Sequence, residues 1–340
     1  TGSCSEDPYE PIEGQDFRFI ASKTISPHFG LFDDTLTEVS TPYTFAPVPN
    51  YPDSVVAKVS DNYTYILAAG KNNDQPVYLS TNNGVSWVSL GFSTNRYEVH
   101  ISKSGEVMIV ETGVNVIEVS NDFGTTFTTF NLNNIITLGT SIAYISRLAL
   151  SSGGKFITIS VYANGITAGD SPMRILKSSD YGNSFSDITN NVGFPFTGAQ
   201  YDVSIQDALI SGDGKYEMYF NALGVSRYSN DYGQTFSDKA YPLFDWNETG
   251  QISEDGQYFM LDSTSSPGRY STDFGVSTSL GSVANSDTFG LGVSNSGEFS
   301  FTGSTSSSTS IKYSNNFFNS FTEVSGAPGV AAPYILVDVS

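Results

Sequence analysis

The sequence predicts an all-β protein, a β-propeller of four-stranded antiparallel blades, and three observations support this prediction. Residues that favour strands are abundant, with 24 Phe, 20 Tyr and 39% hydrophobic residues. A related octet occurs six times at intervals of 40 to 58 residues, and a period of about 40 to 50 residues is typical of propeller blades. Most octets are preceded by a short apolar strand, a Ser-x-x-Gly turn and a second strand, as in VHISKSGEVMIV.

The residue types of the octet are those that a tight turn between two strands requires. The six copies are STNNGVSW at 80, SNDFGTTF at 120, SSDYGNSF at 178, SNDYGQTF at 229, STDFGVST at 271 and SNNFFNSF at 314. The first Ser and the third Asp or Asn can bond backbone N–H groups, the fifth Gly permits a positive φ, and the last aromatic returns to apolar packing. The expected structural turn residues are Asn82, Gly84, Asp122, Gly124, Asp180, Gly182, Asp231, Gly233, Asp273, Gly275 and Asn316. Phe318 replaces this Gly and Thr278 replaces the aromatic, so those two hairpins are expected to be less regular.

The octet resembles the Asp-box, or BNR, repeat Ser-x-Asp-x-Gly-x-Thr-Phe/Trp of sialidase-like β-propellers. The resemblance extends from about Phe17 to Ser340 and implies a propeller architecture. It implies no particular activity, because the repeat occurs in glycosidases, sorting receptors and assembly factors alike. We therefore expect the octet carboxylates to stabilise turns rather than to act as acids, bases or metal ligands.

Both ends of the chain bear on the number of blades. The segment 334–340, YILVDVS, looks like a first blade strand that lacks its partners, and 14–22, GQDFRFIAS, resembles a second strand. The segment SPHFGLF, with Ser26 and Gly30, looks like a degenerate octet. We expect seven blades in one domain, residues 17–340, closed by pairing of the C-terminal strand with the N-terminal strands. Six blades are the alternative.

Composition excludes some partners and favours others. A formal net charge of −20 repels nucleic acid, and no apolar run reaches the ~20 residues that cross a bilayer. The start at Thr1 and the wealth of Ser, Thr and Asn favour an extracellular or cell-surface protein, in which Asn62 and Asn247 match the N-glycosylation pattern. Cys4, the only cysteine, lies in an acidic leader, residues 1–16, and the two together suggest self-association.

The predicted topology separates two faces of the propeller. In a meander, the turns after the first and third strands project from one face, and the other loops project from the opposite face. Length varies on that second face, in segments 128–146, 162–173, 186–206 and 237–249. A ligand is expected there, because binding residues gather on variable loops of a rigid scaffold.

Candidate binding residues on this loop face include one aromatic platform. Trp246, beside Asp245, is a candidate for stacking on a sugar, although packing between blades is its alternative role. The other binding candidates are Tyr162, Tyr201 and Arg147.

Catalytic candidates are fewer. A hydrolase of neutral glycans needs two carboxylates, which Asp202, Asp207 and Glu98 could supply. Sialidase activity is not expected, because the Arg-Ile-Pro motif is absent and Arg174-Ile175 is followed by Leu. Two His residues are too few for a clustered His metal site. We expect no metal or other cofactor. The preferred prediction is a non-catalytic propeller that binds protein or glycan; the alternative is a glycoside hydrolase acting on neutral polysaccharide.

Overall fold

The computed structural model describes most of the chain between residues 18 and 325. The described residues are 18–22, 29–33, 48–49, 55–61, 63–70, 76–93, 98–136, 141–164, 173–194, 205–221, 225–240, 250–261, 269–277, 279–280, 288–294, 296–298, 300–304, 310–314, 316–320 and 322–325.

The described residues form an all-β fold of four-stranded antiparallel sheets, as predicted, with one further two-stranded sheet. The two-stranded sheet comprises β1 (Arg18–Ser22) and β2 (Phe29–Asp33). The next sheets are β3 (Val55–Val59), β4 (Ile66–Gly70), β5 (Pro76–Ser80) and β6 (Val88–Ser93), then β7 (Val99–Ile101), β8 (Met108–Gly113), β9 (Val116–Ser120) and β10 (Thr128–Asn131). They are followed by β11 (Ser141–Leu150), β12 (Ile157–Asn164), β13 (Met173–Ser178) and β14 (Ser186–Asp187), then β15 (Ile205–Ile210), β16 (Glu217–Asn221), β17 (Val225–Ser229) and β18 (Ser237–Ala240). The last are β19 (Gly250–Ile252), β20 (Phe259–Leu261), β21 (Arg269–Ser271) and β22 (Ser279–Leu280), then β23 (Thr288–Val293), β24 (Ser300–Ser304), β25 (Ser310–Ser314) and β26 (Thr322–Ser325). Two short helical turns, η1 (Leu132–Asn134) and α1 (Thr189–Val192), lie between strands.

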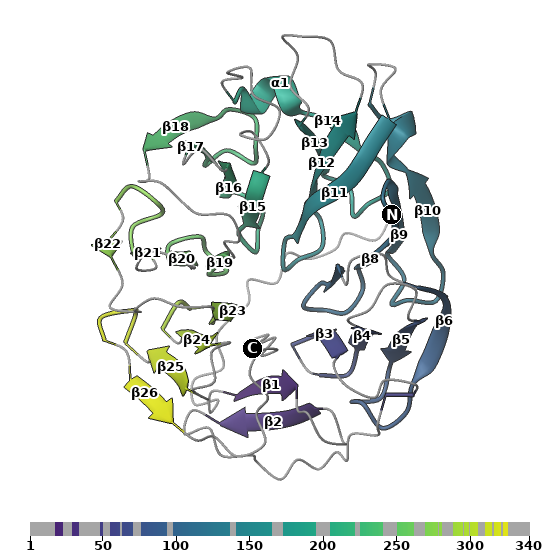
Figure 1. The fold of residues 1–340 in the computed structure, drawn as a ribbon, viewed down its shortest axis with the longest axis horizontal. Helices are drawn as coiled ribbons and strands as arrows, with labels where there is room; N and C mark the ends of the chain where they lie inside the picture. The colour runs from purple at the N-terminus through teal and green to yellow at the C-terminus, as the bar shows by residue number, and fades with distance from the viewer. Residues whose placement is uncertain are drawn as a thin grey trace, which may run out of the picture.

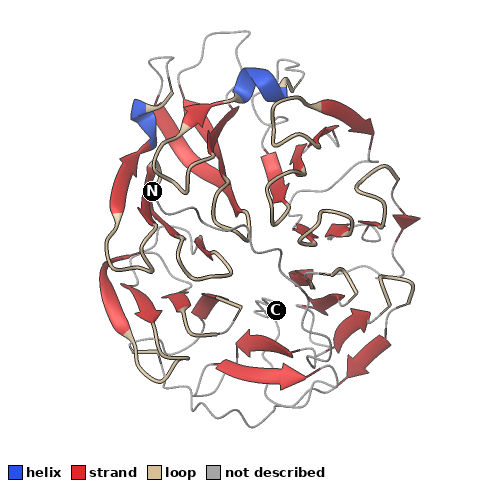
Figure 2. Ribbon diagram, turned by 180° about the vertical axis from the view of Figure 1, so that it is seen from behind, coloured by secondary structure: helices blue, strands red, loops and turns tan. Residues whose placement is uncertain are grey.

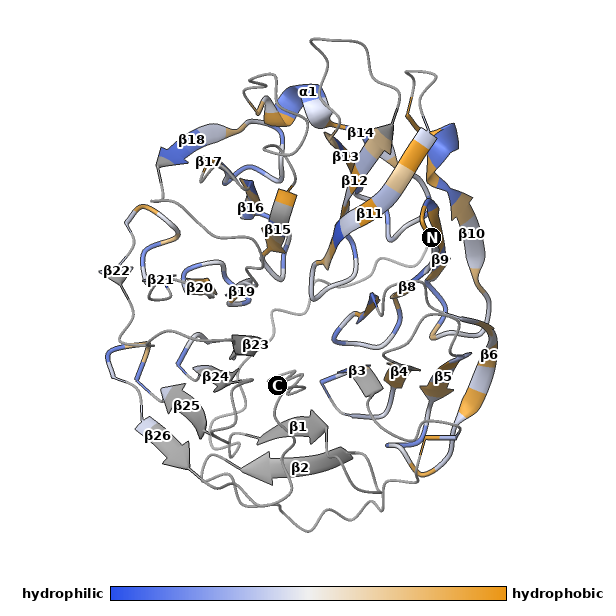
Figure 3. Cartoon of the chain, in the orientation of Figure 1, coloured by the Kyte–Doolittle hydropathy of each residue, from blue (hydrophilic) through white to orange (hydrophobic). Residues whose placement is uncertain are grey.

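The sheets stand around a common axis, with the first strand of each sheet innermost (Figure 1). The inner strands β7, β11, β15, β19 and β23 contact one another in chain order. The same radial arrangement is seen from behind in Figure 2. Apolar clusters fill the spaces between neighbouring sheets; one of them joins Ile109 and Val119 to Ile145 and Ile157 of the following sheet. Figure 3 accordingly colours much of strands β8 and β9 as hydrophobic.

Each octet is a turn closed by its own Ser and Asp side chains. In the second copy, Ser120 Oγ accepts from the Gly124 N–H at 2.9 Å and donates to Asp122 Oδ1 at 2.8 Å. Asp122 also accepts from the Thr126 N–H at 2.9 Å and from the Thr126 hydroxyl at 2.6 Å. The same bonds occur around Asp180, Asp231 and Asp273. Asn82 and Asn316 have an amide NH₂ group in place of the second carboxylate oxygen, and this group donates a hydrogen bond to the hydroxyl of Ser86 or Ser320.

The fourth octet residue also has a positive φ, which the sequence did not reveal. It is Phe123 (φ 61°) in the second copy and Tyr232 (φ 62°) in the fourth. In the sixth copy Phe318 adopts φ 64° at the Gly position, and its N–H still reaches Ser314 Oγ at 3.2 Å. The expected irregularity of this turn is therefore not found, because burial of the Phe318 side chain at 2% exposure offsets the backbone strain.

One N-terminal prediction is wrong. Residues 29–32 of SPHFGLF lie in strand β2, and Gly30 pairs with Ala21 of β1, so Gly30 does not lie in an octet-like turn. Phe and Leu side chains dominate the segment, and such residues favour a strand over a tight turn. Ser26 lies outside the described residues.

The octets also hold neighbouring sheets together. A Cβ on Gly124 would lie 2.5 Å from Leu79 of the preceding sheet and 3.1 Å from Met108 Sδ. The aromatic at the fourth position packs against a turn aromatic of the preceding sheet, with 5.2 Å between the ring centroids of Phe123 and Tyr65. Equivalent pairs are Tyr232 with Phe156, Phe274 with Tyr216 and Phe317 with Tyr258.

The turns between the first and second strands are joined near the axis. A Lys103 N–H donates to Ser152 O at 2.9 Å, and a Gly212 N–H donates to Glu254 O at 2.8 Å. Lys103 Nζ also lies 2.5 Å from Glu254 Oε2, although the two turns belong to sheets that are not neighbours in the chain. The turns between first and second strands are therefore bonded to one another at this end of the molecule.

Gly124→Ala tests the contact between octet and neighbouring sheet, with Gly91→Ala as its control. Both residues have a positive φ near 77°, at +76° and +79°, but a Cβ on Gly91 would meet nothing within 4 Å. Both substitutions carry the backbone cost of about 1 kcal/mol, and only Gly124→Ala adds overpacking of about 1–3 kcal/mol. Urea denaturation should show the larger loss for Gly124→Ala; equal losses would contradict the packing role.

Candidate functional site

Several predicted site residues lie outside the described part of the chain. These are Asp202, Tyr201, Asp245 and Trp246, together with Asn62, Asn247, the leader 1–16 with Cys4, and the segment 334–340. Glu98, Arg147, Tyr162 and Asp207 are described, and the structure brings three of them together.

An axial cluster of Glu98, His100, Arg147 and Asp207 lies on the inner strands of three successive sheets. Glu98 immediately precedes β7, Arg147 lies in β11 and Asp207 lies in β15. Arg147 Nε is 3.8 Å from Asp207 Oδ1, and His100 Nε2 is 3.0 Å from Glu98 Oε2. His100 is 20% exposed and belongs to this cluster.

Two β-bulges orient Arg147 and Asp207, the central pair of the axial cluster. The pairing of β11 with β12 shifts register between Ile145 and Arg147, and that of β15 with β16 shifts between Ile205 and Asp207. A bulge turns the following side chain away from the simple alternation of a strand. No local sequence signal marks either bulge, which explains why the meeting of Arg147 and Asp207 was not predicted.

Asp207 is fixed by backbone donors from two sheets. Its Oδ1 accepts from the Ala208 N–H at 2.8 Å, and its Oδ2 accepts from the N–H of Gly250, the first residue of β19. Its side chain is 14% exposed. Burial raises the pKa of Asp207 to about 7, against the opposing effects of Arg147 and these N–H groups, and the charge of Glu98 raises it further.

Glu98 behaves in the opposite way. Burial raises its pKa, but the hydrogen bond and charge of His100, with the charges of Arg147 and Lys58, outweigh burial and leave the pKa below its ordinary value. Its side chain is 31% exposed. At neutral pH the axial cluster therefore combines an ionised carboxylate, a carboxyl that is partly protonated, and a guanidinium. Together they can both donate hydrogen bonds to a ligand and accept them.

A tyrosine pair lies on β11, which carries Arg147, and on its neighbour β12. The rings of Tyr144 in β11 and Tyr162 in β12 are parallel within 4°, with centroids 5.2 Å apart. Both are partly exposed. The Ser146 hydroxyl donates to Ile205 O at 2.7 Å and ties this part of β11 to β15. Tyr162 was a predicted binding residue, whereas Tyr144 and Lys58 were missed, because nothing local distinguishes them from other strand residues.

The other charged groups offer less chemistry. Among the described residues, no three His, Cys, Asp or Glu side chains lie close enough to hold a metal ion. Arg174 pairs with Asp187 and Arg227 pairs with Asp238, so both arginines have carboxylate partners outside the axial cluster. In the octet residue Asp122, burial raises the pKa, but bonds from Thr126 and Ser120 outweigh it and the pKa is lowered. No helix in the described residues is long and apolar enough to span a membrane.

Comparison with known proteins supports the fold alone. No family model matches the sequence, and no curated protein matches it. Among solved structures, the Cps50 (Swd1) β-propeller domain of Myceliophteria thermophila is 10% identical, with a TM-score of 0.55 over 82% of this chain and 90% of that one. A proposed 6-phosphogluconolactonase from Bacteroides uniformis is 13% identical, with a TM-score of 0.59 over 96% of this chain and 100% of that one.

A third structure, an ancestral GH74 enzyme, is 18% identical with a TM-score of 0.55. The match covers 80% of this chain but only 38% of that enzyme. These matches establish a β-propeller fold. At such identities they carry no function across, because propellers with this fold serve unrelated activities.

Asp207→Asn tests the buried carboxyl of the axial cluster. The carboxyl titrates near 3.8 when unperturbed and near 7 when folded, so the folded chain holds the extra proton between these values. The associated stability is present below about pH 4 and is lost as the pH rises to about 7. The Tm of the wild type should therefore fall relative to that of Asp207→Asn as the pH rises from about 4 to about 7. A Tm difference that stays constant with pH would contradict the raised pKa.

Proposed function

We propose that this chain is a non-catalytic binding propeller that recognises a protein or glycan on its loop face, over the axial cluster. One observation carries the proposal. Polar side chains of the octets are used within their own turns and between sheets, whereas the bulges of β11 and β15 direct Arg147 and Asp207 toward each other beside a partly exposed Glu98. The axial cluster thus presents partly exposed charged side chains, Glu98 at 31% and Arg147 at 29% exposure, for hydrogen bonds to a ligand.

We further propose that the propeller has seven blades and belongs with the Asp-box propellers. Contacts of β1 with β3 support this, because β4 contacts β7 and β12 contacts β15 in the same way, second strand against the next first strand. In this proposal, β1 and β2 take the second and third positions of a blade. The segment 334–340 would supply its first strand and close the ring. The Ser, Asp and Gly geometry of the octet turns supports the Asp-box assignment.

Composition supports an extracellular or cell-surface location for this binding module. The same composition-based reasoning suggests that the acidic leader 1–16 and Cys4 mediate self-association, since a single cysteine can form a disulfide only with another chain. Sizing the protein with and without reductant, and without residues 1–16, tests this. An unchanged size in all three states would remove the leader from the proposal.

Loss of ligand on substitution of the axial cluster tests the binding proposal. Arg147→Met and Glu98→Gln should each weaken binding to a ligand found on a panel of glycans and extracellular proteins about tenfold, since each removes a charge-assisted bond. The control is Asp180→Asn in an octet, because Asn82 and Asn316 occupy the same position naturally. Binding that survives both axial substitutions but is lost in the octet variant would overturn the proposal.

The second candidate is a glycoside hydrolase acting on neutral polysaccharide. The opposite pKa shifts of Glu98 and Asp207 favour it, because such a hydrolase needs one ionised and one protonated carboxyl at the same pH. In this role Asp207 is the general acid and Glu98 the base or nucleophile.

Turnover of neutral polysaccharides separates this candidate from simple binding. Asp207→Asn and Glu98→Gln should each lower kcat by at least about 10²-fold, and kcat should decline above about pH 7 as Asp207 ionises. Tyr181→Ala, at an exposed octet position, is the control that should keep full activity. Binding without any turnover over the whole panel would rule out the hydrolase and leave the binding proposal standing.

A further inference from the structure

Each boundary between neighbouring sheets repeats one packing arrangement. The residue before an octet Ser meets the start of the second strand in the next sheet, under the Gly of that sheet's own octet. Leu79 and Met108 meet in this way under Gly124. Val119 and Ile157 meet under Gly182, where a Cβ would lie 2.5 Å from Val119 and 3.1 Å from Ile157. These two boundaries are apolar.

At the next boundary the same two positions carry opposite charges. Lys177 of β13 and Glu217 of β16 meet under Gly233, whose added Cβ would lie 2.5 Å from Lys177 Nζ and 2.8 Å from Glu217 Oε2. The two side chains are only 7% and 1% exposed. Burying an ion pair costs several kcal/mol per ion before its attraction is counted. Apolar residues fill the equivalent positions under Gly124 and Gly182, so the fold does not need this ion pair.

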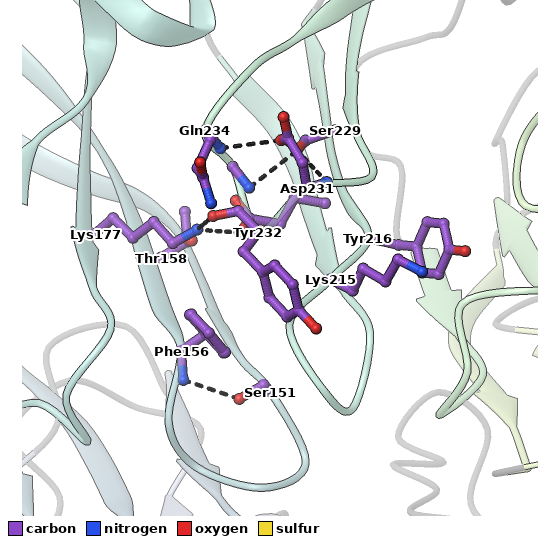
Figure 4. Close-up of polar contacts among 12 residues, drawn as sticks. Ser151, Phe156, Thr158, Lys177, Lys215, Tyr216, Ser229, Asp231, Tyr232 and Gln234 are labelled. Atoms are coloured by element: carbon purple, nitrogen blue, oxygen red, sulfur yellow. Dashed lines mark hydrogen bonds and ion pairs between the residues drawn. The ribbon is translucent and has the colours of Figure 1, made fainter.

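The surroundings supply one acceptor and one donor to the pair. Lys177 Nζ contacts Glu217 Oε1. It also donates to Tyr232 O at 2.6 Å, and Figure 4 shows Lys177 beside Tyr232. Tyr219 donates its hydroxyl proton to Glu217 Oε2 at 3.1 Å, and that hydroxyl lies 3.2 Å from Thr158 Oγ1. The Phe156 ring lies 5.2 Å from Lys177 Nζ. Burial raises the pKa of Glu217, and Lys177 lowers it in part.

We propose that Lys177 and Glu217 condense into an amide cross-link that joins β13 to β16. The Lys177 ammonium group first transfers a proton to the Glu217 carboxylate. The amine lone pair then forms a bond to Glu217 Cδ, the bond from Cδ to Oε1 breaks, and Oε1 leaves as water with a second proton from Nζ. The step consumes no oxidant or other co-reactant. Proximity in a site shielded from water replaces the activation that a free amine and acid would need.

The product fits its surroundings better than the reactants do. A secondary amide has one N–H and one C=O. Tyr232 O already accepts from Nζ, and the Tyr219 hydroxyl already donates to Oε2, the oxygen that remains. Condensation also removes two buried charges from a boundary that is apolar in neighbouring copies. In a chain with one cysteine, it provides a covalent brace that an internal disulfide cannot.

Intact-mass spectrometry of the folded wild-type chain tests the cross-link directly. The expected mass is lower than the mass calculated from the sequence by one water molecule. Proteolysis should yield one branched peptide that joins the segments containing Lys177 and Glu217. A folded wild-type chain with the full calculated mass shows an ion pair only and overturns the proposal.

Three variants locate the bond. Lys177→Val combined with Glu217→Ile copies the apolar pair Val119 and Ile157, so it should fold and show the full calculated mass. Tyr219→Phe keeps both reactants but removes the donor, so the cross-linked fraction at a fixed time should decrease.

Lys103→Met is the matched control, because Lys103 also pairs with a glutamate, Glu254, but at 22% and 33% exposure. This variant should keep the mass deficit of the wild type. A deficit that persists in the double variant, or disappears in Lys103→Met, would overturn the assignment to Lys177 and Glu217.

Discussion

The structure depends on the octet turn, which packs a glycine without a side chain directly against the neighbouring sheet. Two consecutive residues of each octet adopt a positive φ, and the second is Gly in every copy but the last. Side chains of Ser and of Asp or Asn within the octet accept hydrogen bonds from the backbone N–H groups of the turn. The Gly then packs so closely on the preceding sheet that a Cβ could not be added without movement, as Gly124 and Gly182 show. Spacing between sheets is thus set by glycine backbone.

The aspartates at the two ends of the molecule have opposite pKa shifts. Asp231 lies in an octet, where bonds from Thr235 and Ser229 outweigh burial and lower its pKa. Asp207 lies on an inner strand near the other end, where burial dominates and raises the pKa to about 7. The same side chain is therefore a constant anion in one place and a titrating group in the other. Only the second behaviour is useful for recognising a ligand or for proton transfer.

The repeat also identifies residues that differ from their counterparts at equivalent positions. Since each boundary between sheets uses equivalent positions, a residue can be compared with its counterparts in the same chain. Lys177 and Glu217 stand out in this comparison, as Phe318 does at a position held by Gly in the other copies. Phe318 is explained by the burial of its ring against Tyr258 and Tyr270. Lys177 and Glu217 instead place two charges in a buried boundary, although the neighbouring boundaries under Gly124 and Gly182 are apolar.

The sequence by itself determined the all-β class, the repeating four-stranded unit and the octet residues that lie in turns, because each depends on interactions within a few residues. Only the tertiary structure decided that Phe29 to Asp33 is a strand, that Arg147 and Asp207 meet across two bulges, and that Lys177 faces Glu217. These features join segments far apart in the chain. Their energies come from burial and charge in the assembled sheets, and no local pattern of residues records them.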